Sequence, residues 1–85
     1  MDTSAKAPRI VVFSTPHCPW CTKVKNYLKE KHFRFRDIDV SRDVRAAEDL
    51  VRRTGQTGVP VILINNKPIV GFNRKEIDKV LDIKR

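Results

Sequence analysis

The sequence predicts a small α/β domain with the element order β-α-β-α-β-β-α and a mixed four-stranded sheet flanked by three helices. Three observations lead to this fold class. Short β-branched runs alternate with stretches of helical spacing, and the first two strands are joined through a helix, which makes them parallel. The last two strands are separated only by Asn65-Asn66, which suits a hairpin. A chain of 85 residues has room for one domain, expected over residues 9–85 after a flexible tail at 1–8.

The first half of the chain is expected to hold two strands joined by a helix. Residues 9–14 (RIVVFS) are β-branched and aromatic, as in a short buried strand. Pro19 suits the first position of a helix, because its missing N–H would be unpaired there. Apolar side chains then recur at helical spacing, at Trp20, Val24, Tyr27 and Leu28. The alternation in residues 33–40 (FRFRDIDV) predicts the second strand.

The middle of the chain is expected to form a helix and then a buried strand. Ser41 or Asp43 can cap the helix at its N-terminus, and Gly55 can end it. Residues 60–65 (PVILIN) are almost uninterruptedly apolar, which favours a strand that is buried on both faces.

The C-terminal part is expected to form the last strand and the last helix. The turn at Asn65-Asn66 leads into a strand over residues 67–70. Asn73 can cap the helix, with Glu76 three residues further on, as in a capping box. Helices on both faces of a mixed sheet then complete the fold.

Cys18 and Cys21 are the two cysteines of the chain, three positions apart at the start of the first predicted helix. Residues i and i+3 of a helix are about 5–6 Å apart, which is close enough for a disulfide. At the N-cap, Cys18 meets unpaired N–H groups and the positive end of the helix dipole, which favour a thiolate. Cys21 is a turn deeper. We therefore expect Cys18 to attack a substrate disulfide and Cys21 to resolve the mixed disulfide.

Two other uses of the cysteine pair compete with this one. A structural disulfide is disfavoured, because cytosolic glutathione and thioredoxin would keep it reduced. A metal site would need His17 and His32 beside the cysteines, but His32 lies more than two turns beyond Cys21 and His17 is too close in sequence. No metal is therefore expected.

The composition narrows the class of protein and its surroundings. No apolar run approaches the ~20 residues that cross a bilayer, and the N-terminus lacks a secretory signal, which predicts a cytoplasmic protein. The net charge is +8, and six basic side chains lie between residues 22 and 36 against Glu30 alone. We expect Lys25 and Lys29, i,i+4 neighbours on the outer helix face, to repel each other slightly unless an acidic partner covers them. The charge is either a solvated face or a docking patch for an acidic partner. Nucleic acid is unlikely, since no nucleic-acid-binding motif accompanies the basic residues.

Three motifs together resemble the glutaredoxin family from Arg9 to Leu81: TPHCPWC at residues 15–21, GVP at 58–60 and VGF at 70–72. The resemblance implies the thioredoxin fold in its short glutaredoxin form, with a cis bond between Val59 and Pro60 that faces the cysteines. It also implies protein disulfides as substrates, glutathione as a co-substrate rather than a tightly bound cofactor, and a monomer. The residues expected to contact substrate or glutathione are Thr15, His17, Pro19, Trp20, Val59, Pro60, Gly71, Phe72 and Asn73.

The chain departs from the family pattern at positions that bear on the electron donor. Glutathione-using members usually carry a lysine where this chain has Thr15, and a threonine where it has Gly58. The Gly71-Phe72 pair is similar to the redoxins that serve ribonucleotide reductase and accept electrons from thioredoxin reductase. The electron donor is therefore expected to be either glutathione or thioredoxin reductase. An alternative function is a metal or iron–sulfur carrier, or a redox-sensing binding module, that uses Cys18.

Aromatic side chains are expected beside the cysteines. Trp20 lies between Cys18 and Cys21 in a solvent-facing turn, and Phe72 follows the last glycine motif. Aromatic residues are enriched at contact surfaces, so we expect both to form a rim that binds partner proteins.

Overall fold

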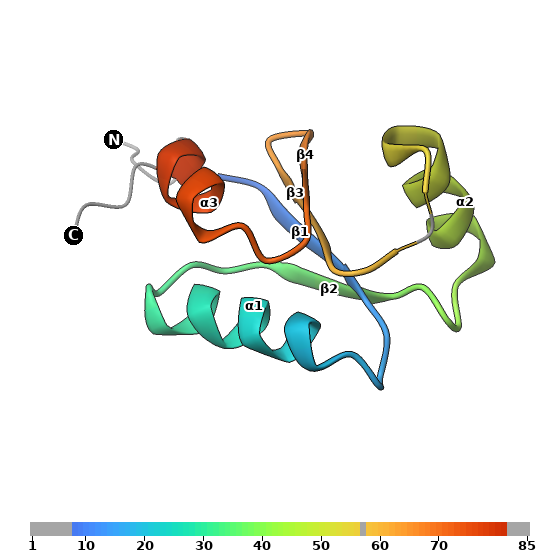
Figure 1. The fold of residues 1–85 in the computed structure, drawn as a ribbon, viewed down its shortest axis with the longest axis horizontal. Helices are drawn as coiled ribbons and strands as arrows, with labels where there is room; N and C mark the ends of the chain where they lie inside the picture. The colour runs from blue at the N-terminus through green and yellow to red at the C-terminus, as the bar shows by residue number, and fades with distance from the viewer. Residues whose placement is uncertain (1–7, 57, 82–85) are drawn as a thin grey trace.

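The computed structural model describes residues 8–56 and 58–81, and its elements have the predicted order and the predicted mixed sheet (Figure 1). Except for Pro8, the predicted tail lies outside the described residues, as do 82–85 of the predicted domain. No helix among the described residues is long and apolar enough to span a membrane. The elements are β1 (Ile10–Ser14), α1 (Pro19–Glu30), β2 (Arg36–Asp39), α2 (Val44–Thr54), β3 (Val61–Ile64), β4 (Lys67–Val70) and α3 (Arg74–Leu81).

The strands are ordered β2-β1-β3-β4 across the sheet. β1 runs parallel to β2, as expected for strands joined through α1, while β3 is antiparallel to both β1 and β4. Asn65 and Asn66 have φ angles of 52° and 72°, and two consecutive positive φ angles are what a two-residue hairpin turn requires. The hairpin prediction is confirmed.

Both faces of the sheet are covered, which explains why β3 is apolar throughout. Ile62 and Ile64 face a cluster with Val24 and Leu28 of α1 and Ile77 of α3. Val61 and Leu63 face the opposite cluster, which includes Leu50 of α2. In Figure 1, α1 and α3 therefore belong to one side of the sheet and α2 to the other.

Helix α2 shows how the sequence fixes the ends of an element. Asp43 caps it, because its Oδ1 accepts the Ala46 N–H at 3.0 Å. Ser41, the other predicted cap, donates its hydroxyl to Asp39 instead. Gly55 ends the helix as predicted, with a φ of 75° that only glycine adopts without strain.

Strand β2 is shorter than the predicted strand over residues 33–40. It pairs only with β1, and the pairing covers Val11–Ser14 opposite Arg36–Asp39. Phe33 leaves α1 in a tight turn, its N–H donating to the carbonyl of Leu28, and packs on the core without joining the sheet. The strand therefore covers only the part of residues 33–40 that pairs with β1.

The alternation of residues 33–40 also changes face in its middle. Phe33 and Phe35 pack on the α1 side of the sheet, whereas Ile38 and Val40 pack on the α2 side. Successive strand residues point to opposite faces, so the change places Asp37 on the α1 side, where the pattern would otherwise continue with an apolar residue.

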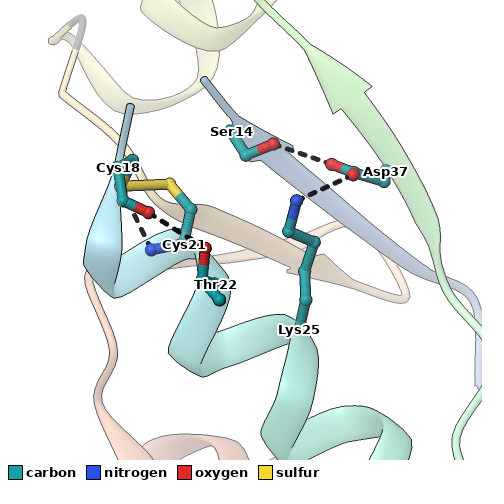
Figure 2. Close-up of a disulfide and its surroundings, with 6 residues drawn as sticks. All are labelled: Ser14, Cys18, Cys21, Thr22, Lys25 and Asp37. Carbon is teal, nitrogen blue, oxygen red and sulfur yellow. Dashed lines mark hydrogen bonds and ion pairs between the residues drawn. A yellow bond between two sulfur atoms is a disulfide. The ribbon is translucent and has the colours of Figure 1, made fainter. Parts of the chain in front are cut away.

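Asp37 is held there by two donors from different elements (Figure 2). The hydroxyl of buried Ser14 donates to Oδ1 at 2.7 Å, and Lys25 Nζ donates to Oδ2 at 2.9 Å. Burial raises the pKa of Asp37, but the hydrogen bonds from Lys25 and Ser14 outweigh it and the pKa lies below its ordinary value. The acidic partner that relieves the expected repulsion between Lys25 and Lys29 is therefore Asp37 of the same chain, toward which Lys25 turns.

We predict that Asp37→Asn lowers the free energy of unfolding at pH 7 by about 0.2–1 kcal/mol, the range for a partly exposed ion pair. Since the pKa of Asp37 is lowered in the folded state, its stabilisation is complete above the unfolded pKa of about 3.9 and is lost as the pH falls through the folded pKa. The difference between parent and variant should therefore shrink below about pH 4. Urea unfolding at a series of pH values measures it.

Asp49→Asn is the matched control, since Asp49 pairs only with arginines of its own helix. Asp37→Asn should still lose some stability as the pH falls, because it retains Asp39, whose pKa is also lowered by Ser41 and Arg42. Parallel acid profiles for the parent and Asp37→Asn would contradict the prediction.

Candidate functional site

Cys18 lies where β1 has ended and α1 begins. It is the N-cap of α1, with Pro19 at the first helical position as predicted. Its backbone is extended, and its Sγ accepts the backbone N–H of Cys21 at 3.1 Å. The side chain that satisfies an unpaired donor of the helix is thus the half-buried sulfur itself.

Cys21 lies one turn inside α1 and differs sharply from Cys18 in its surroundings. Its side chain is 1% exposed, and it forms a disulfide with Cys18 across a Cα–Cα distance of 5.2 Å (Figure 2). The first turn of α1 contains no acidic residue, so no carboxylate of the helix opposes a negative sulfur there. One sulfur is therefore accessible and the other is shielded.

Three aromatic rings extend from the disulfide along α1. Trp20 is 57% exposed, and its ring centroid lies 6.4 Å from that of half-buried Phe72. Phe72 in turn meets the ring of Tyr27 edge-on at 5.7 Å. Trp20 is exposed and Phe72 half-buried beside the disulfide, and Tyr27, which belongs to the core, continues the same row of rings.

The GVP motif at residues 58–60 and the VGF motif at residues 70–72 contact each other through their backbones. The Val59–Pro60 peptide bond is cis, as the resemblance implied. The Gly71 N–H donates to the Pro60 carbonyl at 2.8 Å, with a φ of 78° at Gly71. Pro60 is buried and Val59 and Gly71 are half-buried, so this contact fixes the loop that carries Phe72.

The other predicted contact residues lie on the surface around the disulfide. Thr15 is half-buried just after β1, and His17 and Pro19 are exposed. Exposed Asn73 uses its side-chain oxygen to accept the Glu76 N–H at 3.2 Å, which occupies one donor at the start of α3. Among the described residues, no group of three or more His, Cys, Asp and Glu side chains is arranged to hold a metal.

Sequence reasoning missed the Ser14–Asp37–Lys25 network beside the site. Figure 2 shows Lys25 one turn beyond Cys21 on α1, with its side chain extended to Asp37 on β2, to the right of the disulfide in this view. The feature of the sequence that indicates this network is the change of face in residues 33–40, which leaves Asp37 on the α1 side of the sheet. In this network the charge of Lys25 is paired with a carboxylate of the same fold. Lys23 instead contacts a ring, with its Nζ 4.5 Å from the centroid of Trp20.

Comparison with known proteins agrees with this geometry. A curated glutaredoxin-like 8.6 kDa protein in the rubredoxin operon of Clostridium pasteurianum is 48% identical over 73 residues, which cover 86% of this chain and 97% of that protein. The glutaredoxin-like NrdH-redoxin of Escherichia coli, described as having a thioredoxin-like activity profile, superposes with a TM-score of 0.73 at 27% identity over 91% of this chain and 96% of that one. A buckwheat glutaredoxin in complex with glutathione superposes with a TM-score of 0.72 at 28% identity over 88% of this chain and 74% of that one.

The family model for glutaredoxin matches residues 10–69, from β1 through the cysteine pair to Ile69 in β4. The match includes the disulfide, the cis proline and the sheet that carries them. Cysteine pairs at a helix start carry out thiol–disulfide exchange. The chain therefore belongs to the glutaredoxin family, and its cysteine pair supports the thiol–disulfide oxidoreductase chemistry of that family.

Proposed function

We propose that the protein is a dithiol oxidoreductase that reduces disulfides of proteins and mixed disulfides of glutathione. One observation carries the proposal: the two bonded cysteines differ in access, with Cys18 half-buried at the N-cap and Cys21 1% exposed inside α1. A substrate disulfide can reach only the first sulfur. The second is protected from solvent oxidants but lies within bonding distance of the first.

The reaction proceeds in two exchanges. The thiolate of Cys18 attacks one sulfur of the substrate disulfide, forms a mixed disulfide and expels the other substrate sulfur as a thiolate. Cys21 then loses its proton and attacks Cys18 Sγ, which releases the remaining substrate thiolate and leaves the Cys18–Cys21 disulfide. The substrate gains two electrons and the protein loses two, so a thiol donor must reduce the disulfide before the next turnover.

The Cys21 N–H supports the first exchange. It already points at Cys18 Sγ at 3.1 Å in the disulfide form, so the same donor is in place when that sulfur is a thiolate. Hydrogen bonds to an ionised acceptor are stronger than those to a neutral one, and the N-terminus of α1 adds its positive end. The helix thus stabilises the thiolate that acts as the nucleophile of the first exchange.

The donor is either glutathione or thioredoxin reductase, in the cytoplasm, with the protein acting as a monomer. We expect a reduction potential of about −200 to −270 mV, between glutaredoxin and thioredoxin values. Thr15 brings no charge to the place where glutathione-using relatives usually carry a lysine, and the Asn73 oxygen is engaged in capping α3. These two features favour thioredoxin reductase as the faster donor.

We predict that Cys18→Ser abolishes reduction of both protein and glutathione disulfides, because the accessible nucleophile is lost. Cys21→Ser should accumulate mixed disulfides with protein substrates and keep part of its activity on glutathionylated peptide, since free glutathione can resolve that intermediate. Insulin reduction, glutathionylated-peptide turnover and mass spectrometry of trapped species measure these outcomes.

Far-UV circular dichroism and the unfolding midpoint of each reduced variant serve as the folding control. Activity of Cys18→Ser at the parent rate, or mixed disulfides trapped on Cys21 rather than Cys18, would contradict the assigned roles.

We predict that Thr15→Lys shifts the donor preference toward glutathione. An exposed ion pair with a glutathione carboxylate is worth about 0.2–1 kcal/mol, so the KM for glutathionylated peptide should fall by roughly 1.4- to 5-fold. Thr15→Gln is the matched control, because glutamine is similar in length to lysine but carries no charge. An equal fall in KM for both variants would show that charge at position 15 is not what limits the use of glutathione.

A further inference from the structure

One stripe of α1 begins between the two cysteines and runs the length of the helix. At about 100° per residue, Trp20, Lys23, Tyr27 and Lys31 fall within a sector of about 80° around the helix axis. Phe72 and Arg74 join the stripe from the start of α3. We call these six residues the cation–ring strip: Trp20, Lys23, Tyr27, Lys31, Phe72 and Arg74.

Cations in the strip are positioned by the rings. Lys23 Nζ lies 4.5 Å from the Trp20 ring centroid, while Arg74 Cζ and Lys31 Nζ lie 5.1 Å and 5.7 Å from that of Tyr27. Within the part of the chain that the structure describes, none of the three forms an ion pair with a carboxylate. Their charges are therefore held in place but not neutralised.

The strip borders an open groove of about 840 Å³ beside the rings. Lys29 adds a fourth cation to its lining, and Glu30 is its acidic residue. Asp78 Oδ1 accepts a hydrogen bond from the Tyr27 hydroxyl and so helps to hold the ring in place. With four cations against Glu30 in the lining, the groove attracts negative charge.

We propose that the cation–ring strip binds an acidic segment of the protein whose disulfide Cys18 reduces. This inference rests on the proposed function, since the strip starts at Trp20 beside the reacting sulfur. From Trp20 to Lys31 the helix rises about 16 Å, which an extended peptide covers with about five residues. The partner is thus a disulfide protein with a short run of Asp and Glu next to its reactive cysteine.

A nucleic acid fits the strip less well, although its phosphates are also negative. Single strands bind by stacking bases on exposed ring faces. Here Tyr27 is 7% exposed and Phe72 is half-buried, and Lys23 occupies a face of the one exposed ring, Trp20. Carboxylates need only the cations, which are accessible.

The test uses the reduced full-length protein and disulfide-bearing peptides. Each peptide carries a run of five acidic residues, placed before the cysteine in one peptide and after it in another, and is compared with a peptide in which Asn and Gln replace the Asp and Glu. Single-turnover rates at low salt should be about tenfold higher for the acidic peptide, as expected for a few exposed ion pairs. The advantage should fall as ionic strength rises above ~0.1 M, where the Debye length drops below about 10 Å.

The double variant Lys31→Gln/Arg74→Gln should lose most of this advantage and keep the parent rate on bis(2-hydroxyethyl) disulfide. Arg45→Gln/Arg52→Gln is the matched control, because it removes the same charge from exposed positions on α2, on the other side of the sheet. An equal loss in the control, no preference for the acidic peptide, or competition by an oligonucleotide but not by an acidic peptide would overturn the proposal.

The small disulfide separates this proposal from the proposed function. If the parent does not reduce it through Cys18, the oxidoreductase role fails. Docking is then judged by titrating the Trp20 fluorescence with the same acidic peptide carrying serine in place of cysteine. Binding that disappears in Lys31→Gln/Arg74→Gln but persists in the α2 control supports the strip, and absence of binding overturns it.

Discussion

The hydrogen bond from the Cys21 N–H to Cys18 Sγ is the contact on which the rest of the site depends. It makes the reactive sulfur part of the helix N-terminus, so that the start of α1 and the nucleophile are fixed together. The cap position also sets the spacing, because the next residue that can face Cys18 is one turn further along, at a Cα distance of 5.2 Å. A helix beginning one residue earlier or later would change the exposure of both sulfurs. The chemical asymmetry of the pair is thus a consequence of where α1 begins.

The sheet explains why α1 begins there. β1 lies between β2 and β3 and ends at Ser14, and both of its faces are covered, by α1 and α3 on one side and by α2 on the other. The core is small in a chain of 85 residues, so polar contacts take part in holding α1 to the sheet. Lys25, which lies one turn beyond Cys21 on α1, does this by forming an ion pair with Asp37 on β2. The helix that carries the chemistry is therefore attached by apolar packing along its length and by an ion pair close to the site.

The sequence was sufficient for the element order, the cap at Cys18 and the hairpin at Asn65-Asn66, because each depends on local rules of spacing and backbone conformation. The inward turn of Lys25 could not be predicted in this way. The apolar positions 33, 35, 38 and 40 indicate the change of face that leaves Asp37 on the α1 side. They do not show that Lys25 is the side chain that meets this acid, because that depends on how α1 packs against the sheet. The row of rings was hidden for a similar reason. Tyr27 and Phe72 are 45 positions apart, and only the packing of α3 against α1 brings them together.

The basic residues of α1 illustrate why net charge alone says little about function. Lys23 and Lys25 are two positions apart, and on a helix this separation turns them to different sides. Lys25 meets a carboxylate of its own fold, and the pair has no net charge. Lys23 meets the face of a ring, which orients the ammonium group but leaves its charge intact. A part of the total charge of +8 is therefore held by rings without being neutralised, and this part lies along the stripe that begins beside the reactive sulfur.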